Sequence, residues 1–194
     1  MKARSVLHRY FVLRHGETDA NASGLIQGSS DFSRLTERGK RQAASVGDAV
    51  FGISRNDDAV SSLTMHQVYV SPLTRARETL SLLREHALPG TIPLDETVLH
   101  ELREIDLYDW EGKNKADLEV EDPKAHQAWV VGDAKGCMVS GRKPILETWE
   151  RAGLVWDNLR RKKPIYGKES NTLLICHGTL GQALLCTAFG WDVE

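Results

Sequence analysis

The 194-residue sequence has few cysteines and no long apolar segment. Its cysteines are odd in number and form no C-x-x-C pair, which argues against a disulfide framework or a zinc ribbon; they are Cys137, Cys176 and Cys186. No uninterrupted apolar run approaches the ~20 residues that a membrane-spanning helix needs. These absences favour a reducing compartment and argue against a membrane partner.

An excess of charge of one sign is also lacking. Lysine and arginine together number 25 and aspartate and glutamate 27, for a formal net charge of −2 at pH 7. Because nucleic-acid-binding proteins present a basic face, this balance argues against a nucleic-acid partner, although it allows a local basic pocket. The basic N-terminal stretch MKARSVLHRY has no hydrophobic centre, so we expect an exposed tail rather than a targeting peptide, and a cytoplasmic protein.

Short apolar runs alternate with amphipathic stretches along the whole chain. The apolar runs predict strands at 9–14, 66–71 and 171–176, with a weaker one at 91–95. The amphipathic stretches predict a helix over 37–53 capped by Thr36, a second over 73–87, and a third from Pro144 to the basic end RRKKP.

Each expected helix carries an apolar stripe that should face a core. The stripe residues are Ala43, Val46, Val50 and Ile53 in the first, Leu73, Ala76, Leu80 and Leu83 in the second, and Ile145, Trp149, Ala152, Trp156 and Leu159 in the third. We interpret the two tryptophans of the third helix as core residues. The glycine-rich, charged stretch at about 110–142 is less regular and is interpreted as an inserted cap or loop.

Strands that alternate with helices of this length predict an α/β fold. We expect a three-layer sandwich in which a mostly parallel central sheet is covered by helices on both faces. Residues 1–194 are expected to form a single domain. In such folds ligands bind at the carboxyl ends of the strands.

Basic side chains follow three of the expected strands. Arg14 and His15 come directly after the first, Arg75 follows the second at the opening of its helix, and His177 follows the last. Two arginines and two histidines at one rim would form an electropositive pocket suited to phosphate oxygens. We also expect helix N-termini at this edge to direct backbone N–H groups at the anion.

Four ordered blocks carry more specific information. They are LRHGET followed by Asn21, then SPLTRARET, LREIDLYDWEG and ICHGTLGQALL. In this order and at these separations they resemble the histidine phosphatase superfamily, the phosphoglycerate mutase-like group, over nearly the whole chain. The resemblance implies a phosphoglycerate mutase-like fold and a phosphatase, a phosphoric monoester hydrolase that works through a phosphohistidine intermediate.

The resemblance also implies a role for each matching residue. His15 would be the nucleophile, and Glu104 would supply the proton to the departing oxygen, with Glu101 as the alternative acid. The transferring oxygens would be held by Arg14, Arg75 and His177, and the same pocket would be lined by Asn21, Gln27 and Gly28. The expected chemistry needs no metal and no cofactor, because fixed cations supply the charge stabilisation.

The substrate is expected to be a small phosphorylated sugar or sugar acid. The stretches GLIQGSSDFSRLTERG and LREIDLYDWEG, with Tyr108 where most members of the family have glycine, resemble the plant and algal branch that includes 2-carboxy-D-arabinitol-1-phosphatase. That likeness makes 2-carboxy-D-arabinitol 1-phosphate a candidate substrate, and the plastid stroma an alternative location if a transit peptide has been removed. Two alternatives remain, a phosphoglycerate mutase and a non-catalytic or regulatory phosphoprotein-binding member. The oligomeric state is not indicated.

Overall fold

A parallel four-stranded sheet forms the centre of the computed structural model, which describes residues 7–52, 63–161 and 169–193. The strands β1 (Leu7–Arg14), β2 (Gln67–Val70), β3 (Thr97–Val98) and β4 (Glu169–Cys176) are arranged in the order β1-β4-β2-β3. Every pairing is parallel, and Arg14 lies opposite Cys176 while Val70 lies opposite Ile175. The carboxyl ends of β1, β4 and β2 therefore meet at one edge, as the sequence predicts.

Strand β4 is buried from Ser170 to Cys176, since it is covered on both faces and paired on both sides. This explains its nearly continuous apolar sequence, which is typical of a central parallel strand.

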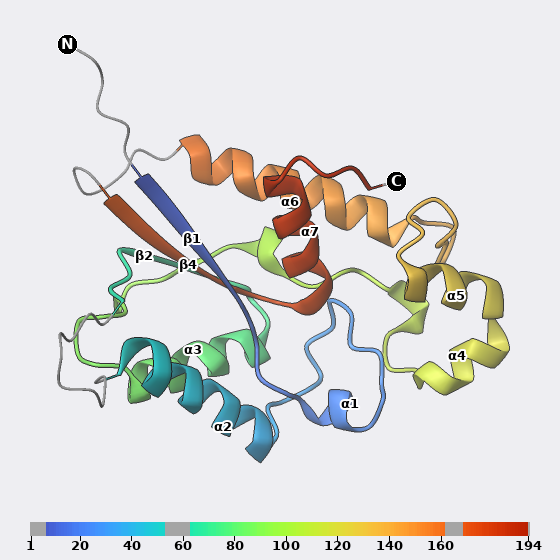
Figure 1. The fold of residues 1–194 in the computed structure, drawn as a ribbon. Coiled ribbons are helices and arrows are strands. Elements are labelled where there is room, and N and C mark those ends of the chain that lie inside the picture. Colours follow the sequence, from blue (N-terminus) through green and yellow to red (C-terminus); the bar gives the residue numbers. More distant parts are fainter. Residues whose placement is uncertain (1–6, 53–62, 162–168, 194) are drawn as a thin grey trace, which may run out of the picture.

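Helices cover both faces of the sheet, which confirms the predicted three-layer α/β sandwich (Figure 1). The helices α2 (Glu37–Val46) and α3 (Thr74–His86) lie on one side, and α6 (Pro144–Arg161) and α7 (Gly178–Ala188) on the other. Alternate residues of β4 enter the two cores, with Leu173 and Ile175 facing the α3 side and Leu174 facing α6 and α7. Hydrophobic burial on both faces thus fixes the position of the carboxyl end of β4, which the next residue, His177, follows directly.

The predicted helix starts are correct, but one helix end is not. The hydroxyl oxygen of Thr36 accepts a hydrogen bond from the Gly39 N–H at 3.0 Å, as a helix N-cap does. Helix α2 ends at Val46 and continues as a π-helical turn, η1 (Gly47–Phe51). The wider π turn shifts the register, so Phe51 is buried in place of Val50, which is 40% exposed. The predicted stripe residue Ile53 lies outside the described residues.

The weak strand predicted at 91–95 is wrong. The third strand is β3, formed further along the chain by Thr97 and Val98. Pro93 has no N–H to donate to a sheet ladder, and Leu94 is 83% exposed. This segment is an irregular connection in which Ile92 alone reaches the core beneath α3.

The segment at 110–142 contains two helices, α4 (Lys115–Glu121) and α5 (Pro123–Val131), beside the carboxyl edge of the sheet (Figure 1). They pack on a separate small core that includes Ile26, Leu107 and Trp110. The remaining short elements are α1 (Asp19–Ala22), η2 (His100–Leu102) and η3 (Tyr108–Trp110). Within the described residues, none of the helices combines the length and the apolar character that crossing a membrane requires.

Helix α6 carries the predicted apolar stripe, and its two tryptophans differ in environment. Trp156 is buried and donates from its indole N–H to the Leu184 carbonyl at 2.9 Å. Trp149 packs against the same core but is only half-buried, because its other side borders a cavity. The prediction that both tryptophans are core residues is therefore correct for Trp156 and only partly correct for Trp149.

Candidate active site

The predicted nucleophile His15 is buried at the end of β1. Its backbone N–H donates to the Cys176 carbonyl at 3.1 Å, which extends the β1–β4 pairing by one residue. Its ring Nδ1 lies 2.7 Å from the Gly16 carbonyl oxygen. Because a carbonyl only accepts hydrogen bonds, Nδ1 must carry the proton, and Nε2 keeps its lone pair.

The surroundings of His15 favour the neutral ring. The pKa of His15 is lowered from 6.5 to about 4, mainly by burial, with smaller contributions in the same direction from the cations Arg75 and Arg14. The hydrogen bond to Gly16 acts in the opposite direction. The ring is therefore uncharged at neutral pH and can act as a nucleophile. Gly16 is required beside it, since a Cβ there would lie 2.3 Å from the Gly39 carbonyl oxygen.

His177 packs edge-on against His15, with ring centroids 5.0 Å apart. Its Nε2 lies 2.7 Å from the hydroxyl oxygen of Ser71, which follows β2. Its Nδ1 is buried and has no hydrogen-bond partner among the described residues. Burial, followed by Arg75, lowers the pKa of His177 well below its usual value, so this ring is also neutral at neutral pH.

Arg75 is almost fully buried at the start of α3. Its two terminal nitrogens donate to the carbonyls of Ser30 and Gly28, each at 2.8 Å. Its Nε is buried without a hydrogen-bond partner among the described residues. A buried guanidinium held by neutral carbonyls is a fixed positive charge available to an anion.

Glu104 is fixed by backbone N–H groups at the beginning of α7. Its carboxylate oxygens accept hydrogen bonds from Thr179 at 3.1 Å and from Leu180 at 3.0 Å. The expectation that helix N-termini would direct N–H groups at a bound phosphate is not met by Thr179 and Leu180 of α7, because their N–H groups donate to Glu104. The guanidinium of Arg14, exposed at the end of β1, lies nearby across Gly178.

Arg151 of α6 reinforces the position of Glu104 from the other side. Its Nη2 donates to the backbone carbonyl oxygen of Glu104 at 2.8 Å, while its Nη1 lies 3.6 Å from the Asp106 carboxylate. Burial lowers the pKa of Arg151 and Asp106 opposes that change. Glu104 is thus held at both its main chain and its side chain.

The loop after α1 forms the opposite wall of the pocket. Asn21 lies within α1 itself and completes the capping box of that helix, because its side-chain oxygen accepts from the N–H of the N-cap residue Thr18 at 3.2 Å. Gln27 accepts a hydrogen bond from the Ser33 hydroxyl. Gly28 has φ +52°, and a Cβ there would lie 2.1 Å from the Glu111 carboxylate. Glu111 in turn accepts from the backbone N–H of Ser29 at 2.9 Å and so anchors the loop.

These elements enclose a pocket of about 240 Å³. Its walls include all but one of the predicted site residues, namely Arg14, His15, Asn21, Gln27, Gly28, Arg75 and Glu104. The exception, His177, contacts the ring of His15 rather than the open space. The alternative acid Glu101 borders a different hollow, together with Arg103 and Glu150.

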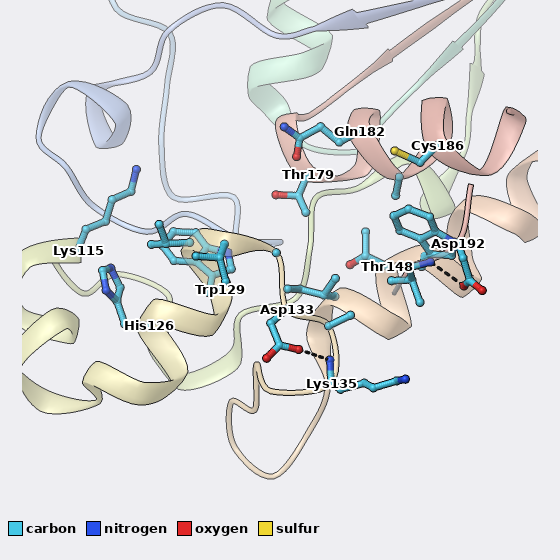
Figure 2. A pocket seen from close by; sticks show the side chains of 18 residues that line it. Lys115, His126, Trp129, Asp133, Lys135, Thr148, Thr179, Gln182, Cys186 and Asp192 are labelled. Atoms are coloured by element: carbon cyan, nitrogen blue, oxygen red, sulfur yellow. Dashed lines mark hydrogen bonds between the residues drawn. The ribbon is translucent and has the colours of Figure 1, made fainter. Parts of the chain in front are cut away.

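A larger cavity of about 1260 Å³ adjoins this pocket and shares four of its lining residues, Lys115, Trp129, Thr179 and Gln182. Figure 2 shows it between α5, which carries His126 and Trp129, and α7, which carries Thr179, Gln182 and Cys186.

Comparison with known proteins decides the family. The model of the histidine phosphatase superfamily (branch 1) matches residues 10–194. The chain belongs to the histidine phosphatase superfamily. This confirms the family resemblance of the four sequence blocks.

Its relatives within the histidine phosphatase superfamily include named phosphatases. The 2-carboxy-D-arabinitol-1-phosphatase of Triticum aestivum is 32% identical over 186 residues, which are 96% of this chain and 33% of that protein. The adenosylcobalamin/alpha-ribazole phosphatase of Escherichia coli (strain K12) is 34% identical over 122 residues, which are 62% of this chain and 52% of that protein. The chain therefore spans about a third of the length of the first of these curated relatives and half of the second.

A solved structure supports the fold of this histidine phosphatase chain. The alpha-ribazole phosphatase from Shigella flexneri matches it with a TM-score of 0.71 and 25% identity, covering 96% of this chain and 82% of the other. The phosphoglycerate mutase-like architecture that the sequence blocks imply is thereby confirmed.

Sequence reasoning missed several residues that shape the pocket. Ser71, Glu111 and Arg151 contact predicted site residues from separate elements. Ser71 and Glu111 stand inside two of the blocks that carry the family resemblance, so those blocks contained a signal for them. Nothing local marks Arg151, because its contact depends on how α6 packs beside the sheet.

Proposed function

We propose that this chain is a metal-independent phosphomonoesterase that forms a phosphohistidine intermediate on His15. The observation that carries the proposal is the arrangement around His15: a neutral ring with Nε2 unprotonated, beside the fixed charge of Arg75, in a pocket that also contains Glu104. Nucleophile, anion-binding cations and proton donor are the parts that phosphoryl transfer needs.

In the first step the lone pair of His15 Nε2 attacks the phosphorus atom of the ester. The N–P bond forms as the P–O bond to the leaving group breaks. Arg14 and Arg75 hold the non-bridging oxygens, which carry the charge of the transition state. Glu104 gives its proton to the departing oxygen, so the alcohol leaves neutral.

In the second step water replaces the alcohol. Glu104, now ionised, takes a proton from the water as its oxygen attacks phosphorus, and the N–P bond breaks with its electron pair returning to Nε2. Inorganic phosphate leaves and Glu104 is protonated again. Burial of His15 and the nearby arginines favour this departure, because the ring is released in the neutral form that both stabilise.

Arginine and lysine side chains, rather than a metal ion, supply the positive charge in this proposal. Within the described residues, no group of three or more histidine, cysteine, aspartate or glutamate side chains is arranged to hold a metal. The pocket is instead lined by the cations Arg14, Arg75 and Lys115 as well as by Glu104. These cations can stabilise a phosphate dianion without a metal.

For the substrate we propose a phosphorylated sugar or sugar acid. The wheat relative is named for its action on 2-carboxy-D-arabinitol 1-phosphate, and it matches 96% of this chain. A phosphoglycerate mutase would use the same groups but must return the phosphoryl group to a bound intermediate before water reaches it. We favour hydrolysis, because the named relatives described above are phosphatases.

A substrate panel tests this proposal. The protein is incubated with 2-carboxy-D-arabinitol 1-phosphate, 3-phosphoglycerate, several sugar phosphates and p-nitrophenyl phosphate, and free phosphate and isomerised product are both measured. We expect free phosphate, lost in His15→Ala and kept in His8→Ala, a matched control on β1, the strand that precedes His15. Conversion of 3-phosphoglycerate to its 2-phospho isomer with little free phosphate would establish a mutase instead.

A further inference from the structure

One buried ring nitrogen beside the nucleophile has no part in the two chemical steps described above. His177 Nδ1 is buried and has no hydrogen-bond partner among the described residues. The residue is 1% exposed, and its ring packs edge-on against that of His15, with centroids 5.0 Å apart. Because buried polar groups in proteins are almost always paired, an unpaired atom at this position calls for a partner that the substrate supplies.

The tautomer of His177 determines what this nitrogen can bind. The ring is neutral, because burial, followed by Arg75, lowers its pKa well below the usual value. A neutral imidazole carries one proton, on either Nδ1 or Nε2. With the proton on Nδ1 the ring offers an N–H to an anion. With the proton on Nε2 it offers a lone pair at Nδ1, which repels an anion.

Ser71 is held beside His177 by both its main chain and its side chain. Its backbone N–H donates to the Ile175 carbonyl at 3.0 Å, which continues the β2–β4 pairing beyond Val70. Its hydroxyl oxygen accepts a hydrogen bond from the Leu73 N–H at 3.3 Å, a local turn that fixes the rotamer of the serine. The same oxygen lies 2.7 Å from His177 Nε2.

Counting hydrogen bonds selects one tautomer of His177. Ser71 is fully buried, and within the described part of the chain its hydroxyl has these two partners, of which the Leu73 N–H can only donate. A proton on Nε2 would leave both the serine proton and the Nδ1 lone pair buried and unpaired. A proton on Nδ1 lets the serine proton pair with Nε2, so that the Nδ1–H alone is unpaired.

The two histidines then share a tautomer but have opposite nitrogens free. His15 donates from Nδ1 to the Gly16 carbonyl, which leaves the Nε2 lone pair for phosphorus. His177 accepts at Nε2 from Ser71, which leaves the Nδ1–H. A lone pair suits the phosphorus atom, and an N–H suits the oxygens bound to that atom.

We propose that Ser71 is a positioning residue that holds His177 in the Nδ1–H tautomer, so that the ring donates a hydrogen bond to the phosphoryl oxygens. The inference rests on the proposed function, since the acceptor it names is the group transferred to His15. Arg75 acts on this group through a fixed charge, and His177 acts through a neutral donor whose identity Ser71 sets. Such a donor stabilises the charge that the oxygens carry in the transition state.

Nuclear magnetic resonance of the protein labelled with ¹⁵N-histidine reads the tautomer directly. Protonated and unprotonated ring nitrogens differ in chemical shift, two-bond couplings to the ring protons tell Nδ1 from Nε2, and His177→Gln identifies the His177 signals by their loss. We expect the Nδ1–H form at His177 in wild type, and its partial or complete replacement by the Nε2–H form in Ser71→Ala. A wild-type His177 protonated on Nε2, or an unchanged tautomer in folded Ser71→Ala, would refute the assignment.

Inorganic phosphate tests the acceptor in the same samples. Its binding is followed to saturation through the signals of His15. We expect the Nδ1 proton of His177 to shift in step with them, because a phosphate oxygen becomes its acceptor. A saturated His15 signal with an unmoved Nδ1 proton at His177 would overturn the proposed contact.

Kinetics of three variants separate positioning from a loss of stability. Ser71→Ala is expected to lower kcat about tenfold, less than the roughly 10²–10³-fold cost of deleting such a donor outright. The loss should be equal for alkyl and aryl esters, because the donor acts on the transferred group and not on the leaving group. Ser71→Thr, which keeps the hydroxyl, should recover most of it.

Thr91→Val is the control variant. It removes another buried hydroxyl, which donates to the Leu88 carbonyl at 2.7 Å and lies outside the pocket, so kcat should match wild type. An equal fall of kcat in Thr91→Val would refute the positioning role. Failure of Ser71→Thr to recover activity while its His177 keeps the Nδ1–H form would do the same.

The resonance measurement does not depend on turnover, so the two proposals fail separately. If the protein hydrolyses no ester in the panel, yet His177 has the Nδ1–H form in wild type and loses it in Ser71→Ala, the proposed function fails and the control of the tautomer by Ser71 stands. If p-nitrophenyl phosphate is hydrolysed while wild-type His177 is protonated on Nε2, the phosphatase stands and the positioning role of Ser71 fails.

Discussion

Replacing His15 by glutamine is expected to make the stability of the fold less dependent on pH below neutrality. The pKa of His15 is lowered from 6.5 to about 4, mainly because the ring is buried with 7% of its surface exposed. The unfolded chain therefore binds a proton more readily than the folded chain between these values. The contribution of the neutral His15 ring to the free energy of unfolding is therefore fully present above about pH 6.5. It is lost progressively as the pH falls toward about 4.

The size of this effect follows from the difference between the two pKa values. At roughly 1.4 kcal/mol for each tenfold change in proton affinity, the fall from 6.5 to about 4 corresponds to about 3 kcal/mol. His177, whose pKa is lowered well below its usual value, acts in the same direction in both proteins. The quantity that reports on His15 is therefore the difference between wild type and His15→Gln.

Urea unfolding across this pH range measures that difference. Wild type should lose about 3 kcal/mol more than His15→Gln between about pH 7 and pH 4. His8→Gln, on the preceding strand β1 and outside the pocket, should follow wild type. Parallel pH profiles for wild type and His15→Gln would refute a buried, neutral His15, and with it the reason for its availability as a nucleophile.

Three further outcomes are expected. Glu104→Gln should slow the hydrolysis of alkyl phosphate esters by about 10²–10⁴-fold and that of aryl phosphates much less, because phenolic oxygens leave without a proton. If Glu101→Gln shows this pattern instead, Glu101 is the proton donor. Arg151→Met should lower kcat for alkyl esters by about tenfold with little change in KM, because Arg151 donates to the backbone carbonyl oxygen of Glu104 at 2.8 Å. Arg151→Lys should restore part of that kcat. An equal loss of kcat on aryl esters would indicate a structural effect. Hydrolysis should persist after exhaustive chelation, and activity recovered only with added divalent ion would contradict the metal-independent mechanism.

The main features of the fold could be predicted because periodicity alone determines them. Strand β4 is a buried apolar run, and the stripe of α3 has Ala76, Leu80 and Leu83 on one face. The two errors arise where local geometry overrides the pattern. A π turn brings Phe51 into the core in place of Val50, and Pro93 prevents the strand expected at 91–95.

The residues that line the pocket could be predicted because most of them follow a strand or stand in a family block. His15 and His177 follow neighbouring strands, so parallel pairing alone brings them to one edge. Sequence could not show that Glu104 would accept from the N–H groups of Thr179 and Leu180 in α7, because these donors lie 75 and 76 residues away along the chain. The large cavity was likewise not predicted, since α5, α6 and α7 line it jointly.

Trapping the phosphoenzyme tests the central claim most directly. The protein is mixed with a ³²P-labelled ester, quenched in denaturant at alkaline pH within the first turnover, and digested for peptide mapping. We predict an acid-labile, alkali-stable label on the peptide that contains His15, absent in His15→Ala and present in His8→Ala. Turnover with no label on His15, or with the label on another residue, would contradict the account.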